Sequence, residues 1–427
     1  MNNPISKPPI SKSMGRTFFR YALLALPLAF LGLPLYLNLP KFYLEQYQVD
    51  LSTLGIALLC LRLGDAFLDP LIGRWSDRHV AQRPAIFIGS AIMCVISFNM
   101  LFLPPMFAPL LWFIVFTALT YFSYSVLTIN YYSAGLQQAD SYDGRTTLSA
   151  WREGVALIGI LLAAILPQAL QAHVPALQSF QIYGAVFSVL MVLGIATLLP
   201  RITKTVPQSG SQESLWMVLK NNLNLRWLLA LFFFNALPSA ITSTLFLFYT
   251  DDVLQAKDNA GYFLAVYFFA AVLSTPFWST IAKKFGKRHA LAAAMVLAMG
   301  SFVWAFLLGN GDADKFYIIC IISGFALGAD MILLPSLLAD VMDGQDEHGS
   351  TGFGLWHALS KWSLALAAGI TMPLLAAFGY QASAIQTAST QGIIAIAYAL
   401  IPCGFKAIAL GILLVSPLDQ HHKRKPA

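Results

Sequence analysis

The sequence predicts an all-α integral membrane protein whose twelve transmembrane helices form two bundles of six. Of its 427 residues, 58% are hydrophobic and only 11% are charged, whereas a soluble globular protein has about 25% charged residues. Apolar runs of roughly 17–25 residues, long enough to cross a bilayer as helices, recur along the whole chain. Lys and Arg residues gather in alternate connections between these runs, as expected of a multi-spanning protein.

The twelve apolar runs fall into two sets of six, separated by one long polar segment. The first set covers residues 18–39, 54–73, 86–103, 110–136, 151–170 and 180–199. The second set covers residues 225–249, 262–282, 289–308, 316–339, 353–378 and 393–415. Pro27, Pro34 and Pro40 predict kinks in the first helix.

This pattern predicts two transmembrane domains with polar ends. We expect a tail at 1–16, a first six-helix bundle at 17–200, a linker at 201–224, a second bundle at 225–416 and a tail at 417–427. Pro70 and Pro276 each precede a basic turn and a new apolar run. This similarity suggests that the two bundles are repeats of one another.

The basic residues predict the orientation of the chain. If the N-terminus is placed in the cytoplasm, twenty of the 26 Lys and Arg residues lie on that side, and only Lys41, Lys257 and Lys315 lie on the other. We therefore expect an inner-membrane protein with both termini in the cytoplasm. Most of the basic residues that give the chain its net charge of +6 then face the anionic surface of the inner leaflet. The expected partners are the lipid bilayer and a small-molecule substrate, with no nucleic acid, and we expect a monomer.

The second apolar run carries three charges that a lipid-facing helix would not tolerate. A charged side chain at mid-membrane costs about 2.5–3.5 kcal/mol on insertion scales. Arg62, Asp65 and Asp69 follow the i, i+3, i+7 spacing of a single helical face. That face is expected to point into the bundle, where the two carboxylates would bind a cation. A purely structural ion pair that fixes this helix is the alternative.

Lys361, in the eleventh run, supplies a fourth intramembrane charge. The two Asp and the two basic residues then sum to zero. We expect Lys361 to approach the carboxylates from the other bundle, and binding of H⁺ or another small cation to rearrange it. The alternative is that its side chain extends to the cytoplasmic interface.

Three motifs resemble the glycoside–pentoside–hexuronide:cation symporter family of the major facilitator superfamily, to which the melibiose permease belongs. The helix-2 pattern R..DA..DP..G...DR is the first, and it begins at Arg62 and ends at Arg78. The acidic turn LLADVMDGQDEHG, residues 337–349, and the helix-11 lysine are the others. The resemblance implies alternating access between two six-helix bundles and a cation site at Asp65 and Asp69, with Arg62 and Lys361 beside it.

The resemblance also implies a substrate cavity. Arg152 takes the place of an arginine near the start of helix 5, and Tyr132 or Tyr131 that of an aromatic residue that stacks on the sugar. Thr128 occupies the position of a helix-4 acid in the family's pattern, and Asn130 lies close to it. Asp330 is a further intramembrane acid and therefore a candidate for substrate binding, unless it only pairs with Lys406.

Two departures from the family's pattern favour H⁺ over Na⁺ as the coupling ion. Leu68 replaces an asparagine, and His357 replaces a threonine one turn before Lys361, so two oxygen ligands for a hard cation are lost. His357 is itself a candidate proton-binding group. We expect no cofactor and no metal other than a possible Na⁺ at Asp65 and Asp69.

The sequence thus predicts a secondary active symporter of a sugar or glycoside, not an enzyme. The carboxylates that hold sugar hydroxyls are missing from their expected positions, which leaves a transporter or exporter of lysolipids or other amphipathic solutes as the alternative. An integral-membrane enzyme would need a nucleophile or metal constellation, which the sequence lacks. A receptor without transport is a further alternative.

Overall fold

The computed structural model describes residues 12–33, 39–49, 51–105, 107–136, 138, 142–171, 173–202, 215–256, 259–342, 349–378 and 387–418. The N-terminal half contains helices α1 (Lys12–Ala22), α2 (Ala25–Leu33), α3 (Leu39–Tyr47), α4 (Leu51–Arg78), α5 (Arg83–Met100), α6 (Pro109–Leu136), α7 (Tyr142–Gln171) and α8 (Ala176–Leu198). The C-terminal half contains α9 (Leu215–Asn221), α10 (Leu223–Phe248), α11 (Ala260–Phe285), α12 (Lys287–Phe306), α13 (Ala313–Val341), α14 (Gly349–Ala377), α15 (Ala388–Ala395) and α16 (Ile401–Val415).

The predicted all-α class is confirmed for the part of the chain that the structure describes. Nine helical stretches there are long and apolar enough to cross a membrane; they correspond to α5–α8, α10–α13 and the α15–α16 pair. The three remaining predicted spans correspond to α1–α2, α4 and α14. A π-helical turn, Ile396–Leu400, joins α15 to α16, and another, Tyr249–Val253, follows α10.

The first predicted helix is interrupted, and the interruption has a local cause. A turn at Leu23 and Leu24 separates α1 from α2. Pro27 has no N–H to donate to the carbonyl of Leu23, and that carbonyl instead accepts from Leu26 N at 3.3 Å. The predicted kink at Pro27 is therefore a helix break, whereas the segment around Pro34 lies outside the described residues.

The predicted linker also contains a short helix. Val218, on α9, is buried and packs in a core cluster that includes residues of both halves. Asn222 then begins α10 by accepting a hydrogen bond from Leu225 N at 2.9 Å, which satisfies a free N–H of the first turn. The first helix, α1, likewise begins within the predicted N-terminal tail, at Lys12.

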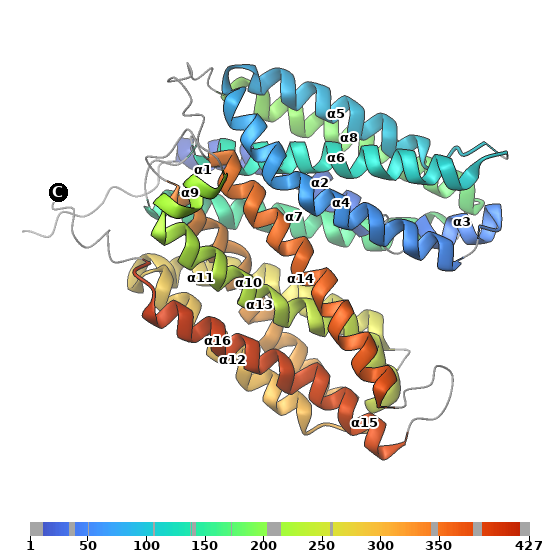
Figure 1. Ribbon diagram of the computed structural model, residues 1–427, viewed down its shortest axis with the longest axis vertical. Helices are drawn as coiled ribbons and strands as arrows, with labels where there is room; N and C mark the ends of the chain where they lie inside the picture. Colours follow the sequence, from blue (N-terminus) through green and yellow to red (C-terminus); the bar gives the residue numbers. More distant parts are fainter. Residues whose placement is uncertain are drawn as a thin grey trace, which may run out of the picture.

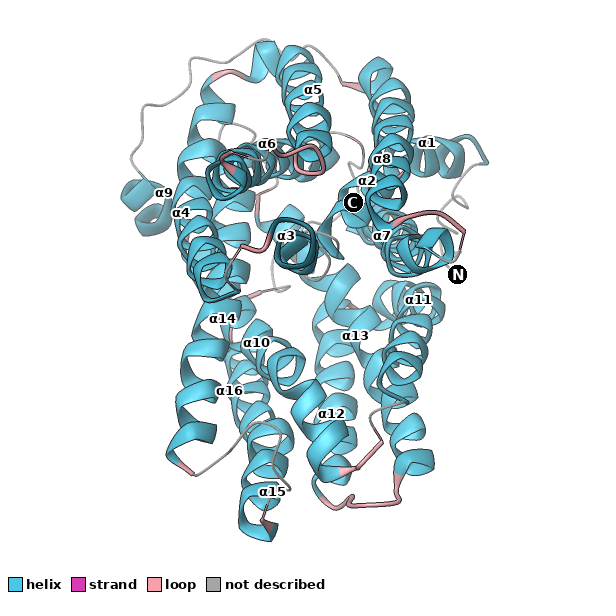
Figure 2. Ribbon diagram, turned by 90° about the vertical axis from the view of Figure 1, so that its right-hand side faces the viewer, coloured by secondary structure: helices cyan, strands magenta, loops and turns pink. Residues whose placement is uncertain are grey.

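The two halves lie close together at one end of the molecule and diverge towards the other (Figure 1). We call the end that carries α9 the linker end and the end that carries α3 and α15 the far end. Figure 2 shows α4 next to α14, and α7 next to α11, at the boundary between the halves. The helices that meet there carry most of the intramembrane charges.

Apolar packing explains why the halves can separate at the far end. One core cluster lies wholly within the N-terminal half, and a second, at the far end, lies wholly within the C-terminal half. The third cluster is the one that crosses the boundary, where Ile72, Ile86, Val126 and Ile129 pack with C-terminal residues such as Leu338. Each half therefore has a core of its own and shares apolar contacts with the other at the linker end.

Two glycines allow α4 and α14 to approach closely as antiparallel neighbours. A Cβ on Gly73 would overlap the backbone carbonyl oxygen of Ser350, and one on Gly354 would lie 2.5 Å from the carbonyl oxygen of Asp69. Because neither backbone oxygen is the end of a flexible side chain, a methyl group at either position must push the helices apart. This contact brings the charged face of α4 against α14.

We predict that Gly73→Ala weakens closure of the linker end. The added methyl group overlaps the α14 backbone, so the conformation described here should become less populated. Pulsed electron paramagnetic resonance between spin labels at Arg78 and Lys284, both exposed at that end, should show a longer or broader distance distribution. Gly89→Ala is the matched control, because its Cβ would meet no atom within 4 Å. An unchanged distribution in Gly73→Ala would show that the close contact does not control closure.

Candidate functional site

Lys361 lies between two buried carboxylates that belong to the opposite half. Its Nζ is 2.5 Å from Asp65 Oδ2 and 2.7 Å from Asp69 Oδ2. Ser125, on α6, donates to Asp65 Oδ1 at 2.9 Å and accepts from Lys361 Nζ at 2.9 Å. The sequence prediction that Lys361 approaches the carboxylates across the two halves agrees with this geometry. We call Asp65, Asp69 and Lys361 the ion triad.

The two carboxylates of the ion triad have different surroundings. Asp65 accepts hydrogen bonds from both Lys361 and Ser125. Asp69 is completely buried, and neither of its side-chain oxygens has a hydrogen-bond partner among the described residues. Its interaction with Lys361 is thus an ion pair by distance without hydrogen-bond alignment. A carboxylate left in this way is costly and is the weaker-held anion of the triad.

Arg62 does not share the burial of the two carboxylates. Arg62 is exposed, whereas Asp65 and Asp69 are buried, so the three residues of the predicted face differ in burial. The ion triad alone, with two buried carboxylates and the partly exposed ammonium of Lys361, carries a single negative charge. The predicted sum of zero also includes Arg62.

His357 faces the substrate region instead of the carboxylates. Its ring packs edge-on against Tyr132 with 5.3 Å between the ring centroids. Its Nε2 is buried and has no hydrogen-bond partner among the described residues. No contact between His357 and a carboxylate of the described residues therefore supports its predicted role as a proton-binding group.

Tyr132, Arg152 and Glu153 form a compact group on α6 and α7. The Arg152 guanidinium lies 3.8 Å above the Tyr132 ring centroid, a cation–π contact. Arg152 Nε pairs with Glu153 Oε1 at 3.0 Å, and the Tyr132 hydroxyl donates to the same oxygen at 3.2 Å. The sequence indicated Tyr132 and Arg152 but missed Glu153, the residue that links them.

This group borders two adjoining hollows, which we call together the central cavity. One measures about 350 Å³ and also contacts Thr128 and Tyr131, and the other measures about 340 Å³ and reaches Asn235 and Asp330 on the C-terminal half. Both include Tyr132, Glu153 and Met331. The central cavity is thus bordered by both halves.

The remaining predicted substrate residues have different surroundings. The Tyr131 hydroxyl donates to the Tyr21 carbonyl oxygen at 3.1 Å and its ring stacks on Tyr21, so its polar end is engaged within the N-terminal half. Asn130 is buried and donates to Ser76 Oγ at 2.8 Å. It joins α6 to α4 and is absent from the residues that line the central cavity.

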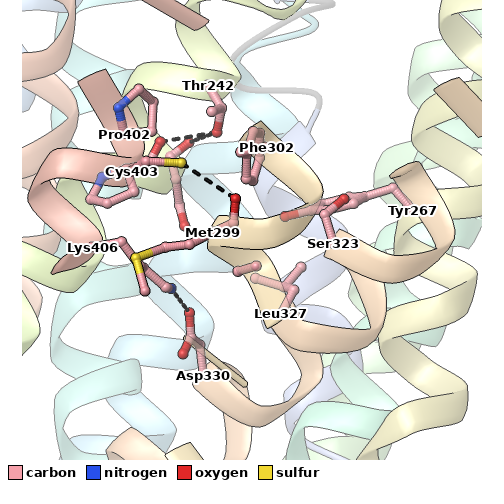
Figure 3. A pocket seen from close by; sticks show the side chains of 13 residues that line it. Thr242, Tyr267, Met299, Phe302, Ser323, Leu327, Asp330, Pro402, Cys403 and Lys406 are labelled. Carbon is pink, nitrogen blue, oxygen red and sulfur yellow. Dashed lines mark hydrogen bonds and ion pairs between the residues drawn. The ribbon is translucent and has the colours of Figure 1, made fainter. Parts of the chain in front are cut away.

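Asp330 pairs with Lys406 inside the C-terminal half. Lys406 Nζ lies 2.5 Å from Asp330 Oδ2, and both side chains are almost fully buried. Figure 3 shows this pair beside a hollow of about 30 Å³ that also contacts Thr242, Tyr267 and Cys403. Asp330 therefore borders both the central cavity and this smaller one.

Polar contacts between the halves close the linker end. Asp77, at the end of α4, accepts from Ser350 N at 2.8 Å and from Thr351 N at 2.7 Å, at the start of α14. A carboxylate there satisfies free N–H groups and complements the helix dipole. Asp340 bridges Arg145 of α7, at 3.2 Å, and Lys287 of α12, at 2.5 Å. The rest of the predicted acidic turn, residues 343–348, lies outside the described residues.

Comparison with known proteins agrees with this architecture and these motifs. Residues 19–420 match the sequence profile of the family described as MFS/sugar transport protein. The chain belongs to the major facilitator superfamily. The glucuronide carrier protein homolog of Escherichia coli (strain K12) is 24% identical to this chain over 90% of this chain and 88% of that protein, which supports the resemblance to the glycoside–pentoside–hexuronide:cation symporter family.

Two further proteins resemble this major facilitator transporter, one in sequence and one in fold. The sodium-dependent lysophosphatidylcholine symporter 1-A of Danio rerio is 20% identical over 94% of this chain and 86% of that protein. The crystal structure of a bacterial homologue of the iron transporter ferroportin, in an outward-facing state, superposes with a TM-score of 0.73 at 14% identity, over 95% of this chain and 99% of that one. That likeness establishes the fold and not the substrate.

We predict that Lys361→Met destabilises this transporter. The substitution leaves two buried carboxylates without their cation, and breaking a buried pair in this way costs about 3–5 kcal/mol. Thermal unfolding in detergent should begin at a lower temperature than in the wild type. The variant D65N/D69N/K361M, which carries no charge at these positions, should recover most of the loss.

Lys315→Met provides the control for this experiment. Lys315 pairs with Asp312 in an exposed position at the far end, 2.7 Å away, and should unfold like the wild type. If Lys361→Met also unfolds like the wild type, Lys361 is not the counter-ion of the buried carboxylates.

Proposed function

We propose that this protein is a cation-coupled symporter of the inner membrane, with both termini in the cytoplasm, that moves a small sugar-like solute by alternating access and is driven by H⁺ in preference to Na⁺. The observation that carries this proposal is the ion triad. Two carboxylates of α4 share one ammonium of α14, and the single negative charge that remains is complementary to one monovalent cation. The linker end would then face the cytoplasm, and the structure corresponds to a state closed on that side.

The position of the triad suggests how binding is coupled to movement. Lys361 belongs to one half and its carboxylates to the other, so their attraction favours contact between α4 and α14. A cation bound at one of the two carboxylates, such as a proton on Asp69, would remove one of the two ion pairs of Lys361 and so weaken this cross-half contact. Differential stabilisation of two arrangements is what a gradient needs in order to drive a rocking transporter.

The surroundings of Asp69 support H⁺ as the coupling ion. Its two oxygens have no hydrogen-bond partner among the described residues, and a protonated carboxyl group would keep the ion pair of Asp65 with Lys361 intact while removing an uncompensated charge. Leu68, next to it, is 41% exposed and offers no oxygen to a metal cation. Sodium prefers several oxygen ligands.

The central cavity supports a small polar solute over an amphipathic one. Glu153 and Asp330 supply the carboxylates that the helix-1 and helix-4 positions lack, and Tyr132 supplies an aromatic face. These groups come from both halves, so a bound solute would contact each of them. A ring with hydroxyl groups fits this combination of acids and one aromatic side chain.

A lysolipid is the second candidate, and a groove between α7 and α11 favours it. This groove, of about 520 Å³, is lined by Phe19, Trp151 and Ile158 from the N-terminal half and by Val272 and Lys283 from the C-terminal half. It would accommodate an acyl chain with an anionic group at Lys283. Competition of lysolipids with sugar uptake would distinguish a substrate from a bystander lipid in this groove.

We predict that Asp69→Asn separates exchange from accumulation. The amide mimics the protonated carboxyl group, and the remaining Asp65–Lys361 pair is neutral. Proteoliposomes with this variant should exchange solute across the membrane but should not concentrate it in response to an ion gradient. Asp312→Asn is the control, because this partly exposed acid lies at the far end, outside the ion triad. Undiminished accumulation by Asp69→Asn would exclude the triad as the coupling site.

We further predict that uptake needs no Na⁺. In Na⁺-free proteoliposomes, an inward proton gradient should drive concentrative uptake, and a protonophore should abolish it. Uptake that follows an imposed Na⁺ gradient and ignores the proton gradient would assign the site to Na⁺ instead.

A further inference from the structure

The charged residues that border the central cavity occur as internally neutral pairs. In the N-terminal half, Arg152 pairs with Glu153 at 3.0 Å. In the C-terminal half, Asp330 of the cavity wall pairs with Lys406 behind it at 2.5 Å (Figure 3). Among the described residues that line the two hollows, Arg152, Glu153 and Asp330 are the charged ones. With Lys406 counted, the site has no net charge.

Each pair lies within one half, and this distinguishes both pairs from the ion triad. Rocking of the halves separates groups on opposite sides of the boundary, such as Lys361 and Asp65, but leaves Arg152 beside Glu153 and Lys406 beside Asp330. The neutrality of the central cavity is therefore preserved through the transport cycle. The triad changes its contacts with conformation, whereas the two pairs are fixed parts of the solute site.

Three buried polar atoms of this region lack hydrogen-bond partners among the described residues. They are Arg152 Nη2, a donor, and Asp330 Oδ1 and Asn235 Oδ1, which are acceptors. A buried unpaired polar group is costly, so a bound solute that offers both acceptors and donors is favoured. A hydroxyl group does both. A carboxylate only accepts, and a quaternary ammonium group does neither.

From these observations we propose that the central cavity selects against net charge, with Glu153 and Lys406 as the residues that determine this specificity. This inference rests on the proposed function and specifies its substrate as an uncharged, hydroxyl-bearing molecule. An anionic analogue would bring an uncompensated negative charge beside Glu153 and Asp330. A cationic analogue would bring a positive charge beside Arg152, in a site from which bulk water is largely displaced.

The proposal has an electrical consequence. A bound cation neutralises the single negative charge of the triad, so the loaded site moves without net charge and the empty site returns with its negative charge. Each cycle with an uncharged solute therefore moves one positive charge across the membrane. Transport should therefore be accelerated by a membrane potential that is negative inside, even without a pH difference. Cotransport of a monovalent anion with the same cation would be electrically silent.

The experiment measures binding of charge-matched analogues to the purified, full-length protein. The probes are neutral hexosides and pentosides, the corresponding uronates and the corresponding amino sugars, compared by displacement and by solute-dependent thermal stabilisation. The wild type should bind at least one neutral sugar, and bind its uronate and amino analogues on the order of tenfold more weakly or worse.

Two substitutions should change this preference in opposite directions. Glu153→Gln leaves Arg152 uncompensated and should shift the ratio of uronate to neutral binding upwards by about tenfold. Lys406→Met leaves Asp330 uncompensated and should shift the ratio of amino sugar to neutral binding upwards by a similar factor. The double variant D330N/K406M is again neutral and should regain the wild-type discrimination against charge, which separates a charge effect from misfolding. Lys315→Met should match the wild type throughout.

The outcomes separate this inference from the proposed function. Preferential binding of a uronate or an amino sugar by the wild type, binding of no neutral sugar, or unchanged preferences in folded Glu153→Gln and Lys406→Met would overturn the charge selection. None of these results would bear on cation coupling at the triad. That coupling is tested separately, by the uptake measurements on Asp69→Asn.

Discussion

The attraction between one lysine of the C-terminal half and two aspartates of the N-terminal half is the interaction on which this structure depends. Charges inside a membrane helix must be paired or face a polar interior, and here the pairing partner comes from the other half of the molecule. Gly73 and Gly354 permit the close contact of α4 and α14 that brings these groups together. The same residues thus hold the halves in contact and leave one negative charge for a cation.

The distribution of the other contacts suits an alternating mechanism. Apolar packing and the polar contacts of Asp77 and Asp340 join the halves at the linker end, whereas each half also has a core of its own. Groups that bridge the halves can exchange partners during transport. Groups paired within one half, such as Arg152 with Glu153, keep their partners and can define the solute site. The transporter thereby separates ion coupling from solute recognition.

Sequence reasoning reached the helices and the coupling residues because both depend on strong local signals. Apolar runs mark membrane helices, and a charge in such a run demands a partner, which led to Asp65, Asp69 and Lys361. Ser125 and Glu153 were not predicted, because a serine inside an apolar helix and an acid directly after Arg152 have no distinctive spacing. The exposure of Arg62 was not predicted because a shared helical face at i, i+3 and i+7 is broad enough to include an exposed edge. The helix break before Pro27 was not predicted, because it depends on a backbone hydrogen bond, from Leu26 N to the carbonyl of Leu23, that has no signal in the sequence.

The central claim is that one proton binds at Asp69 for each solute carried. An external pH electrode tests it directly when solute is added to de-energised cells in weakly buffered, Na⁺-free medium. Wild-type cells should make the medium alkaline in proportion to the solute taken up, and cells with Asp69→Asn should take up solute to equilibrium without this change. Alkalinisation of equal size with Asp69→Asn, or its absence in wild-type cells during uptake, would contradict the claim.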